Sequence, residues 1–415
     1  MARHGREPDR ALGDSVVGKR TAVVACLAAL LAGAVGAAPA GARGSDGGYS
    51  AGELRRDLAA VRIAAGGDVN VVARVDEPDG AVLRARYGTA GLGSTAPVPW
   101  DPEFRAASTT KTFMAVVVLQ LAAQERLSLG DTVEHWLPGV VRGHGNDGAR
   151  ITVRDLLQQT SGIYDYIDDP EVRDRLLNHF DENRYDATPP SRLVATAMRH
   201  APLFTPPPHG SPRRWAYLNT NYLLAAMIAE KAGGADWRQL VEHRIIAPLG
   251  LRHTYIPGEN PYLIGPHERV TIDGPGGVPE DLTEQSYQHT ADSGVVSTPS
   301  DLDRFFRALA DGRLLPAEQW ALMRQTVPYD DLPIPPAGEQ GGYGLGLRVV
   351  PLTCGGVYYT HEGDGFGVYG RPAVGADGGG AVTVSVTSTT ALVDEDRLDR
   401  AVQTLTDHAL CAPRS

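Results

Sequence analysis

The sequence predicts an α/β protein with α+β layering, in which helices flank an antiparallel β-sheet and a mostly helical lobe is inserted into the chain. Strand-like runs occur towards both ends, while the middle reads as helices broken by Pro-rich loops. The 415 residues, 42% of them hydrophobic, can bury a large core in one or two domains. We expect one domain over residues 43–415. Its sheet lobe would comprise about residues 43–130 and 291–415, and its helical lobe about residues 131–290.

The first third predicts a helix, a hairpin and a second helix. Residues 51–63 have helical periodicity, and residues 69–88 read as two strands around the turn at residues 77–80. Residues 105–128, with the helix proper over 108–123, are apolar enough to form a helix that is buried nearly all round.

The remaining two thirds predict helices and then strands. A helix over residues 300–310 would begin at Ser300 as its N-cap. Further helices are expected over residues 153–159, 171–180, 191–200, 222–234, 237–246 and 394–410, and strands over 345–350, 355–361 and 381–389.

The N-terminal segment predicts export. Five basic residues precede residue 21, residues 21–42 carry no charge, and Ala40 with Ala42 forms an A-x-A cleavage site. An uncleaved membrane anchor is the alternative, although Gly and Ala dilute the hydrophobicity of this segment. We therefore expect residues 1–42 to be a signal peptide, and the processed protein to be secreted, extracellular and without a stable membrane span.

Cysteine usage agrees with export. Cys26 lies in the leader, so only Cys354 and Cys411 remain afterwards. Two thiols in an oxidising compartment are expected to pair, which predicts a disulfide between Cys354 and Cys411.

Charge and histidine spacing exclude several classes of function. The chain has 39 Lys and Arg against 50 Asp and Glu, which argues against nucleic acid and anionic membranes as partners. The histidines show no H-E-x-x-H or comparable ligand spacing, and there is no G-x-S-x-G elbow. We expect no metal, no organic cofactor and a monomer.

Lysine usage draws attention to Lys111. The chain has three lysines, Lys19, Lys111 and Lys231, and all its other fixed positive charges are arginines. Lys111 is therefore a candidate for a task that arginine cannot perform, namely to present a deprotonated amine near neutral pH. Burial on the predicted apolar helix would lower its pKa.

Ser108 lies three residues before Lys111, so the two side chains would share a helix face. The amides of the first helical turn favour developing negative charge, and a neutral amine can activate a serine hydroxyl as a nucleophile. The alternative is that Ser108 merely caps the helix while Lys111 extends to solvent.

Two further polar motifs follow in the chain. Tyr217-Leu218-Asn219 precedes a predicted helix, and His361-Glu362-Gly363 ends a predicted strand. With Ser108-x-x-Lys111 they form the ordered set S-x-x-K, Y-x-N and H-x-G, which resembles the motifs of the penicillin-recognising serine hydrolases. The Tyr and His variants are similar to secreted D-alanyl-D-alanine carboxypeptidases, which share their fold with class C β-lactamases and related esterases. The likeness extends to ITVRDLLQQTSGIYDY (151–166), IIAPLGL (245–251), GYGLGLR (342–348) and the Cys354/Cys411 pair.

The resemblance implies a division of roles. Ser108 would attack the carbonyl, Lys111 and Tyr217 would share the proton transfers with Tyr217 running as a phenolate, and Asn219 would orient the substrate and Lys111. His361 would add positive or polar character beside them. The backbone amides of Ser108 and Asp364 would form the oxyanion hole. A packed aromatic ring and a structural hydrogen bond are the ordinary alternatives for Tyr217 and His361.

Three residues bear on substrate binding. Arg348 matches the family position that holds the carboxylate of a D-alanine-terminated peptide, unless it is one surface arginine among many. Gly363 would let substrate approach the backbone, unless it only makes a turn. Glu362 is a departure, because the close relatives have a hydroxyl residue there and a carboxylate would repel a substrate carboxylate. The sequence leaves three alternatives open for Glu362: the side chain turns away, it pairs with Arg348, or it indicates a different substrate such as an ester or a D-amino-acid amide.

The resemblance therefore implies a D-alanyl-D-alanine carboxypeptidase that acts on peptidoglycan stem peptides or another small acyl substrate, with β-lactam antibiotics as covalent inhibitors. The alternatives are a β-lactamase, an esterase or D-amino-acid amidase of the same fold, and a penicillin-binding sensor without turnover.

Overall fold

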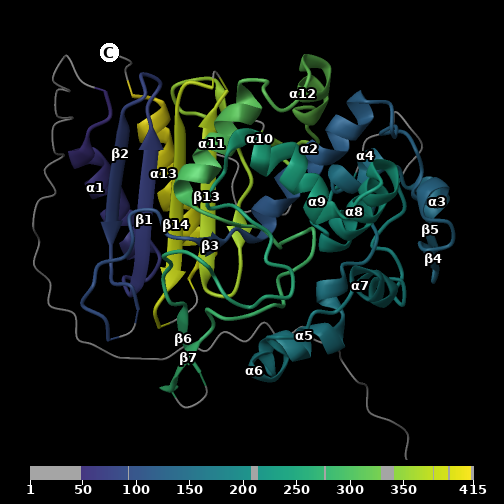
Figure 1. The fold of residues 1–415 in the computed structure, drawn as a ribbon, viewed down its shortest axis with the longest axis horizontal. Helices are drawn as coiled ribbons and strands as arrows, with labels where there is room; N and C mark the ends of the chain where they lie inside the picture. Colours follow the sequence, from purple (N-terminus) through teal and green to yellow (C-terminus); the bar gives the residue numbers. More distant parts are fainter. Residues whose placement is uncertain are drawn as a thin grey trace, which may run out of the picture. The chain divides into compact units, whose positions relative to one another are not determined.

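The computed structural model describes residues 48–91, 93–206, 214–274, 277–328, 341–376, 378–390 and 393–412. The predicted signal peptide at residues 1–42 and the domain boundary after it lie outside these ranges and stay predictions. In the described residues the main sheet has the order β2-β1-β14-β13-β11-β10-β9, with β12 paired to β13. Every pairing in it is antiparallel. Figure 1 shows this sheet beside a group of helices, as the sequence predicts.

The sheet joins the two ends of the domain. The hairpin β1 (Val69–Asp76) and β2 (Val82–Tyr87) pairs with β14 (Ala381–Ser388), with Val72 opposite Ser385. Alternate valines of β1 and β14 pack with α1 (Ala51–Ala64) and α13 (Glu395–Leu410), while α11 (Pro299–Ala310) contacts the other face. The remaining strands are β9 (Gly342–Tyr343), β10 (Arg348–Pro351), β11 (Val357–Thr360), β12 (Gly363–Asp364) and β13 (Val368–Gly375).

Strand β13 is central and was not predicted from the sequence. Its residues VYGRPAVG include two glycines and a proline, which usually signal turns, and burial on both faces removes the polar alternation of a half-exposed strand. Its buried Arg371 is accommodated because the guanidinium donates to Asp364 at 2.6 Å and to Asp399 at 2.7 Å.

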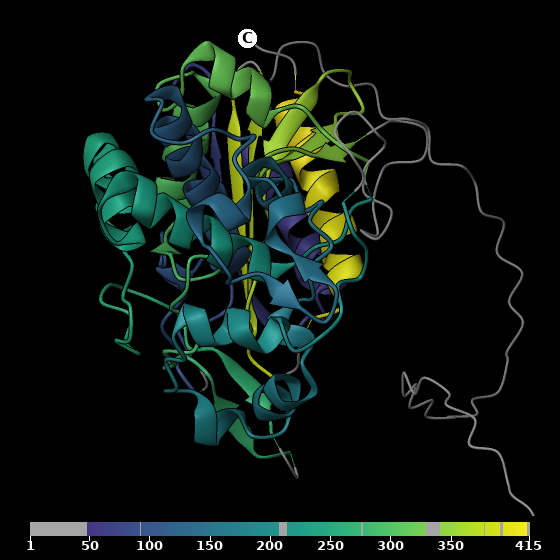
Figure 2. The same cartoon turned by 90° about the vertical axis from the view of Figure 1, so that its right-hand side faces the viewer.

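The helical side is built around α2 (Thr110–Ala123), which packs against α8 (Asn219–Gly233) and is buried on all sides near its start. The 3₁₀ turn η1 (Ala107–Thr109) leads into α2. Figures 1 and 2 show the other helices on this side of the sheet. They are α3 (Val133–Trp136), α4 (Val153–Leu157), α5 (Pro170–Leu177), α6 (Phe180–Asn183), α7 (Pro190–Ala197), α9 (Trp237–Val241), α10 (Ala247–Leu249) and α12 (Ala317–Met323), with short turns η2 (Gly148–Arg150), η3 (Tyr166–Asp168) and η4 (Glu242–Ile246).

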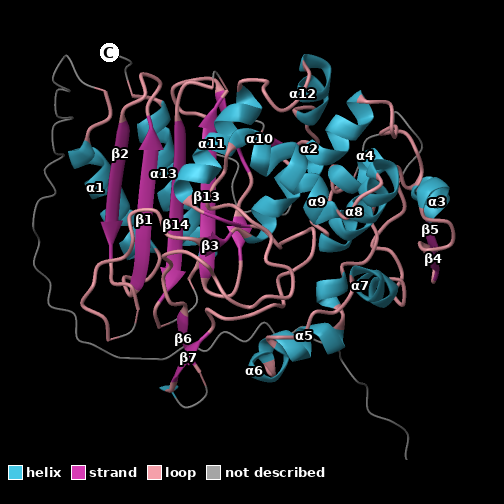
Figure 3. Ribbon diagram, viewed as in Figure 1, coloured by secondary structure: helices cyan, strands magenta, loops and turns pink. Residues whose placement is uncertain are grey.

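Three two-stranded pairs complete the described structure, as Figure 3 shows by type of element. They are β3 (Phe104–Arg105) with β8 (Val296–Ser297), β4 (Arg142–Gly143) with β5 (Asn146–Asp147), and β6 (Thr271–Asp273) with β7 (Pro279–Asp281). Over the described residues, no helix combines the length and the apolar character needed to cross a membrane.

Several predicted helix boundaries differ from the structure, and two of them concern α11 and the helix predicted over residues 237–246. Helix α11 is capped by Thr298, whose Oγ1 accepts from the Asp301 amide at 3.3 Å. Pro299 then occupies the first turn, and Ser300 donates its hydroxyl to Asp101 at 2.6 Å instead of capping. The helix predicted over residues 237–246 changes to π-helix at Glu242, where η4 begins.

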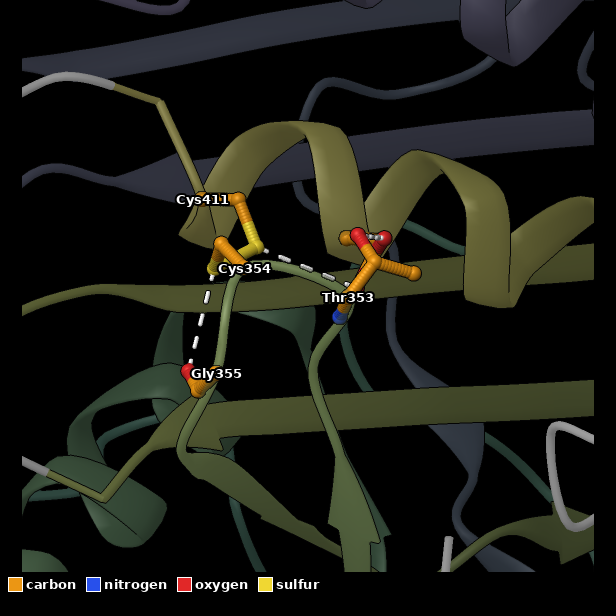
Figure 4. Close-up of a disulfide and its surroundings, with 5 residues drawn as sticks. Thr353, Cys354, Gly355 and Cys411 are labelled. Carbon is orange, nitrogen blue, oxygen red and sulfur yellow. Dashed lines mark hydrogen bonds between the residues drawn. A yellow bond between two sulfur atoms is a disulfide. The ribbon is translucent and has the colours of Figure 1, made fainter. Parts of the chain in front are cut away.

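The predicted disulfide between Cys354 and Cys411 is confirmed. It joins the end of α13 to the turn between β10 and β11, and Figure 4 shows the two cysteines beside Thr353 and Gly355. The Thr353 amide donates to Asp407 at 2.9 Å, which adds a second link between the same segments.

The double substitution Cys354→Ser and Cys411→Ser is expected to lower the free energy of unfolding by about 4 kcal/mol, because the bridge closes a long loop in the unfolded chain. The sequence separation is 57 residues. Urea unfolding of wild type and variant measures the difference, and wild type with a reductant serves as the control. An unchanged midpoint would contradict the prediction.

Candidate active site

The start of α2 places Ser108 and Lys111 together. Ser108 lies in η1, and the Lys111 Nζ donates to its Oγ at 2.9 Å. The Lys111 side chain is 0% exposed. The alternative in which Lys111 extends to solvent is therefore wrong. Ala107, directly before Ser108, has a φ of 43°, a strained conformation of the kind that clusters at functional sites.

Three acceptors surround the Lys111 amine. Besides Ser108, Nζ donates to Asn219 Oδ1 at 2.8 Å and to the Asp292 carbonyl at 3.0 Å. Burial lowers the pKa of Lys111 to about 8, although the carboxylates of Asp292, Asp165 and Asp364 oppose this shift. About one tenth of the amines would therefore be neutral at pH 7 and most of them above pH 8.

Tyr217 also contacts Ser108. Its hydroxyl hydrogen-bonds with Ser108, and its ring centroid lies 4.9 Å from the Lys111 Nζ. Burial raises the pKa of Tyr217 well above its usual value, and Tyr343 raises it further. The phenol is therefore neutral in this arrangement, which opposes the expected phenolate and suits a relay that accepts one proton while it donates another.

Asn219 is oriented by a residue that the motif analysis did not single out. Asp165 Oδ2 accepts from the Asn219 backbone amide at 2.9 Å and from its Nδ2 at 3.0 Å. Asp165 lies in the TSGIYDY stretch just before η3, and it is 3% exposed. Sequence spacing could not pair Asp165 with Asn219, because the two residues are 54 positions apart. The available signal was that Asp165 is a carboxylate within a segment that resembles the family.

His361 is buried and engaged at both ring nitrogens. Its Nε2 lies 2.9 Å from the Tyr343 hydroxyl, and its Nδ1 lies 2.8 Å from the Glu362 carbonyl. Burial lowers the pKa of His361 to about 4, and the charge on Lys111 lowers it further. The imidazole is therefore neutral at pH 7, so it can supply polar character but not the positive character that was the other expectation.

The residues on both sides of Ser108 pack against His361 and strand β12. The Thr109 hydroxyl donates to the His361 carbonyl at 2.9 Å. A Cβ on Gly363 would lie 2.0 Å from the Ala106 carbonyl oxygen, so only glycine permits this approach. Gly363 thus brings the H-E-G segment beside the nucleophile by close packing. Its predicted contact with substrate stays a prediction.

Arg348 and Glu362 pair with each other across β10 and the segment after β11. The Arg348 Nη1 donates to Glu362 Oε1. Burial raises the pKa of Glu362, but the Arg348 guanidinium outweighs this and holds it at about 2. Of the three alternatives that the sequence left open for Glu362, the structure shows the pairing with Arg348. The Glu362 carboxylate therefore neutralises the positive charge of Arg348 within the site.

Several of these residues line one cleft of about 770 Å³, a size that suits a small ligand. Its polar end contains Ser108, Tyr217, Asn219, Arg348, His361, Glu362 and Asp364. Its other lining residues are both apolar and charged, and the apolar ones include Leu177 of α5 and Phe180 of α6, with the Phe180 and Phe366 ring centroids 4.3 Å apart.

A sequence model of the family described as Beta-lactamase matches residues 59–406. The chain belongs to this beta-lactamase family. It resembles a D-stereospecific amidohydrolase from Streptomyces sp., whose solved structure is 36% identical, has a TM-score of 0.71 and matches over 83% of this chain and 98% of that one. Penicillin-binding protein 4* of Bacillus subtilis (strain 168) is 27% identical over 54% of this chain and 48% of its own length.

Esterase EstB of Burkholderia gladioli is 31% identical over 52% of this chain and 51% of its own length. The chain thus spans about half the length of these two curated relatives. These relatives differ in the activity that their names state.

The arrangement in this beta-lactamase-family cleft suits nucleophilic acyl chemistry. A half-buried hydroxyl lies within hydrogen-bonding distance of a buried amine whose pKa is lowered, and a neutral phenol contacts the same hydroxyl. The roles carried over for the individual residues stay predictions, and the variants proposed below test them.

Proposed function

We propose that this chain is a serine hydrolase that forms an acyl-enzyme on Ser108 and cleaves amides of D-amino acids whose leaving group carries no carboxylate. The pairing of Arg348 with Glu362 carries this proposal, because a guanidinium already paired to a carboxylate offers little to a second one. The 36% identity to a D-stereospecific amidohydrolase supports the choice of substrate class.

In the proposed reaction the Ser108 oxygen bonds to the substrate carbonyl carbon while its proton passes to the neutral Lys111 amine, directly or through Tyr217. The backbone amides of Ser108 and Asp364 donate to the resulting oxyanion. The C–N bond then breaks, and the leaving amine takes a proton from the Lys111 and Tyr217 pair. Water attacks the acyl-enzyme by the same steps and releases the acid.

A D-alanyl-D-alanine carboxypeptidase acting on peptidoglycan stem peptides, with β-lactams as covalent inhibitors, is the second candidate. The placement of Arg348 in the cleft favours it, because displacement of Glu362 would free the guanidinium for a terminal carboxylate. We also propose that the protein is secreted and acts outside the cytoplasm. The Cys354–Cys411 disulfide supports this location, since such bridges persist in oxidising compartments.

The substitution Glu362→Thr separates the two candidates. We expect wild type to hydrolyse the terminal carboxamide of N-acetyl-D-Ala-D-Ala faster than the free acid, two substrates that share the scissile bond. Removal of the Glu362 carboxylate is expected to raise kcat/KM for the free acid relative to the carboxamide by about tenfold or more. Product release followed by chromatography measures both rates.

Glu280→Gln is the matched control, because Glu280 also lines the cleft. It is expected to leave the ratio of the two rates unchanged. Wild type that prefers the free acid would overturn the amidase proposal and favour the carboxypeptidase, and cleavage of neither substrate would count against both.

A further inference from the structure

Asp165 is a buried carboxylate that hydrogen-bonds to Asn219, the residue that in turn accepts a hydrogen bond from Lys111. One oxygen, Oδ2, accepts from both the backbone amide and the side-chain Nδ2 of Asn219. Because Nδ2 is committed to Asp165, the other end of the Asn219 amide, Oδ1, is turned to the Lys111 amine at 2.8 Å.

We propose that Asp165 is a positioning residue that sets the orientation of the Asn219 amide and, through it, the place and the protonation of the Lys111 amine. Without an acceptor at the Asp165 position, the Asn219 amide could turn its NH₂ group towards Lys111. Two donors would then face each other, and Lys111 would lose one of its three acceptors.

The charge on Asp165 acts in addition to its hydrogen bonds. Burial raises the pKa of Asp165 to about 6, so the carboxylate is mostly ionised at pH 7 and raises the pKa of Lys111. The other charged groups that act on Lys111 are Asp292, which precedes β8, and Asp364 in β12, while Asp168 in η3 acts on Asp165. The titratable Tyr217 and His361 also face Lys111, and neither is charged at pH 7.

Two substitutions separate orientation from charge. In Asp165→Asn the side-chain oxygen can still accept both Asn219 N–H groups, while the negative charge and the acceptor that the Ile167 amide uses at 3.4 Å are lost. In Asp165→Ala both are lost. We therefore expect Asp165→Asn to lower the pKa of Lys111 by about one unit and to shift the midpoint of the pH–rate profile down equally, with the plateau rate kept within a few fold. Asp165→Ala is expected to lower the plateau rate by about 10²-fold.

The lysine content of the chain makes the pKa directly measurable. Only Lys19, Lys111 and Lys231 would give signals in a protein labelled with ¹³C at lysine Cε, and Lys231 is exposed and serves as an internal reference. Lys231→Arg assigns the reference signal. An NMR titration of the full chain then reports the pKa of Lys111 without any substrate.

Asp301 provides a matched control. Its Oδ2 also accepts from a backbone amide, that of His253 at 2.8 Å, and from a side chain, Thr254, at 3.0 Å. It lies in α11 and is equally buried. Asp301→Asn and Asp301→Ala are expected to lower stability while they leave the Lys111 pKa and the pH midpoint unchanged.

An unchanged Lys111 pKa in Asp165→Asn, or equal plateau rates for Asp165→Ala and wild type, would overturn the inference. The rate readout rests on the proposed function, but the titration does not. A shifted Lys111 pKa in a chain that hydrolyses none of the substrates would retain the influence of Asp165 on Lys111 and reject the proposed function.

Discussion

Ser108→Ala is expected to abolish acylation and to lower kcat/KM by on the order of 10⁴-fold or more, because the proposed mechanism then has no nucleophile. The fold should change little. Ser108 is half-buried, and the substitution removes one oxygen that contacts Lys111 and Tyr217. Intact-mass spectrometry over time, after mixing with p-nitrophenyl acetate or benzylpenicillin, measures the adduct.

The two acylating probes also separate the candidate functions. A persistent penicillin adduct on wild type would favour a penicillin-binding peptidase or sensor, and a transient one with rapid loss of antibiotic would favour a β-lactamase. An adduct with the ester alone fits the amidase or an esterase. Ser300→Ala is the control, because Ser300 bonds Asp101 at the start of α11. An adduct of undiminished yield on Ser108→Ala would place the nucleophile elsewhere.

Much of the sheet could be predicted because its signals are local. Alternating valines in residues 69–76 and 381–388 identify two strands, and a turn connects the two strands of the first hairpin. Strand β13 could not be predicted, because its two glycines and its proline usually signal turns and its arginine depends on partners in β12 and α13. The N-cap of α11 moved to Thr298 because Pro299 fits the first helical turn.

Some features of the candidate site could likewise be predicted from local sequence, and others could not. The spacing of Ser108 and Lys111 is local, so their contact could be predicted from a helix face. The pairing of Arg348 with Glu362 depends on how β10 and β11 align, with Arg348 opposite Thr360, and no spacing rule supplies that register. The neutral states of Tyr217 and His361 follow from burial, which becomes visible only when the whole cleft is assembled.

Lys111→Arg is expected to lower kcat/KM by about 10³-fold, because the guanidinium stays charged and cannot accept the proton of Ser108.

The rate of wild type is expected to depend on pH in a specific way. The pKa of Lys111 is about 8, so the amine is protonated below that pH, and kcat/KM should rise about tenfold per pH unit up to pH 8 and then level off. His361, with a pKa of about 4, does not titrate in this range. Initial rates from pH 6 to 10, in steps of about half a unit, measure both effects.

Lys231→Arg is the matched control, since it makes the same chemical change at an exposed lysine in α8 and should leave both the rate and the pH midpoint unchanged. The larger guanidinium can also lower the rate by disturbing the packing at a fully buried position. The pH dependence separates these causes. A packing defect would lower the rate at every pH but keep the rise towards pH 8, whereas loss of the titrating base removes that rise. Substantial turnover by Lys111→Arg, with the wild-type midpoint retained, would show that the base is another group.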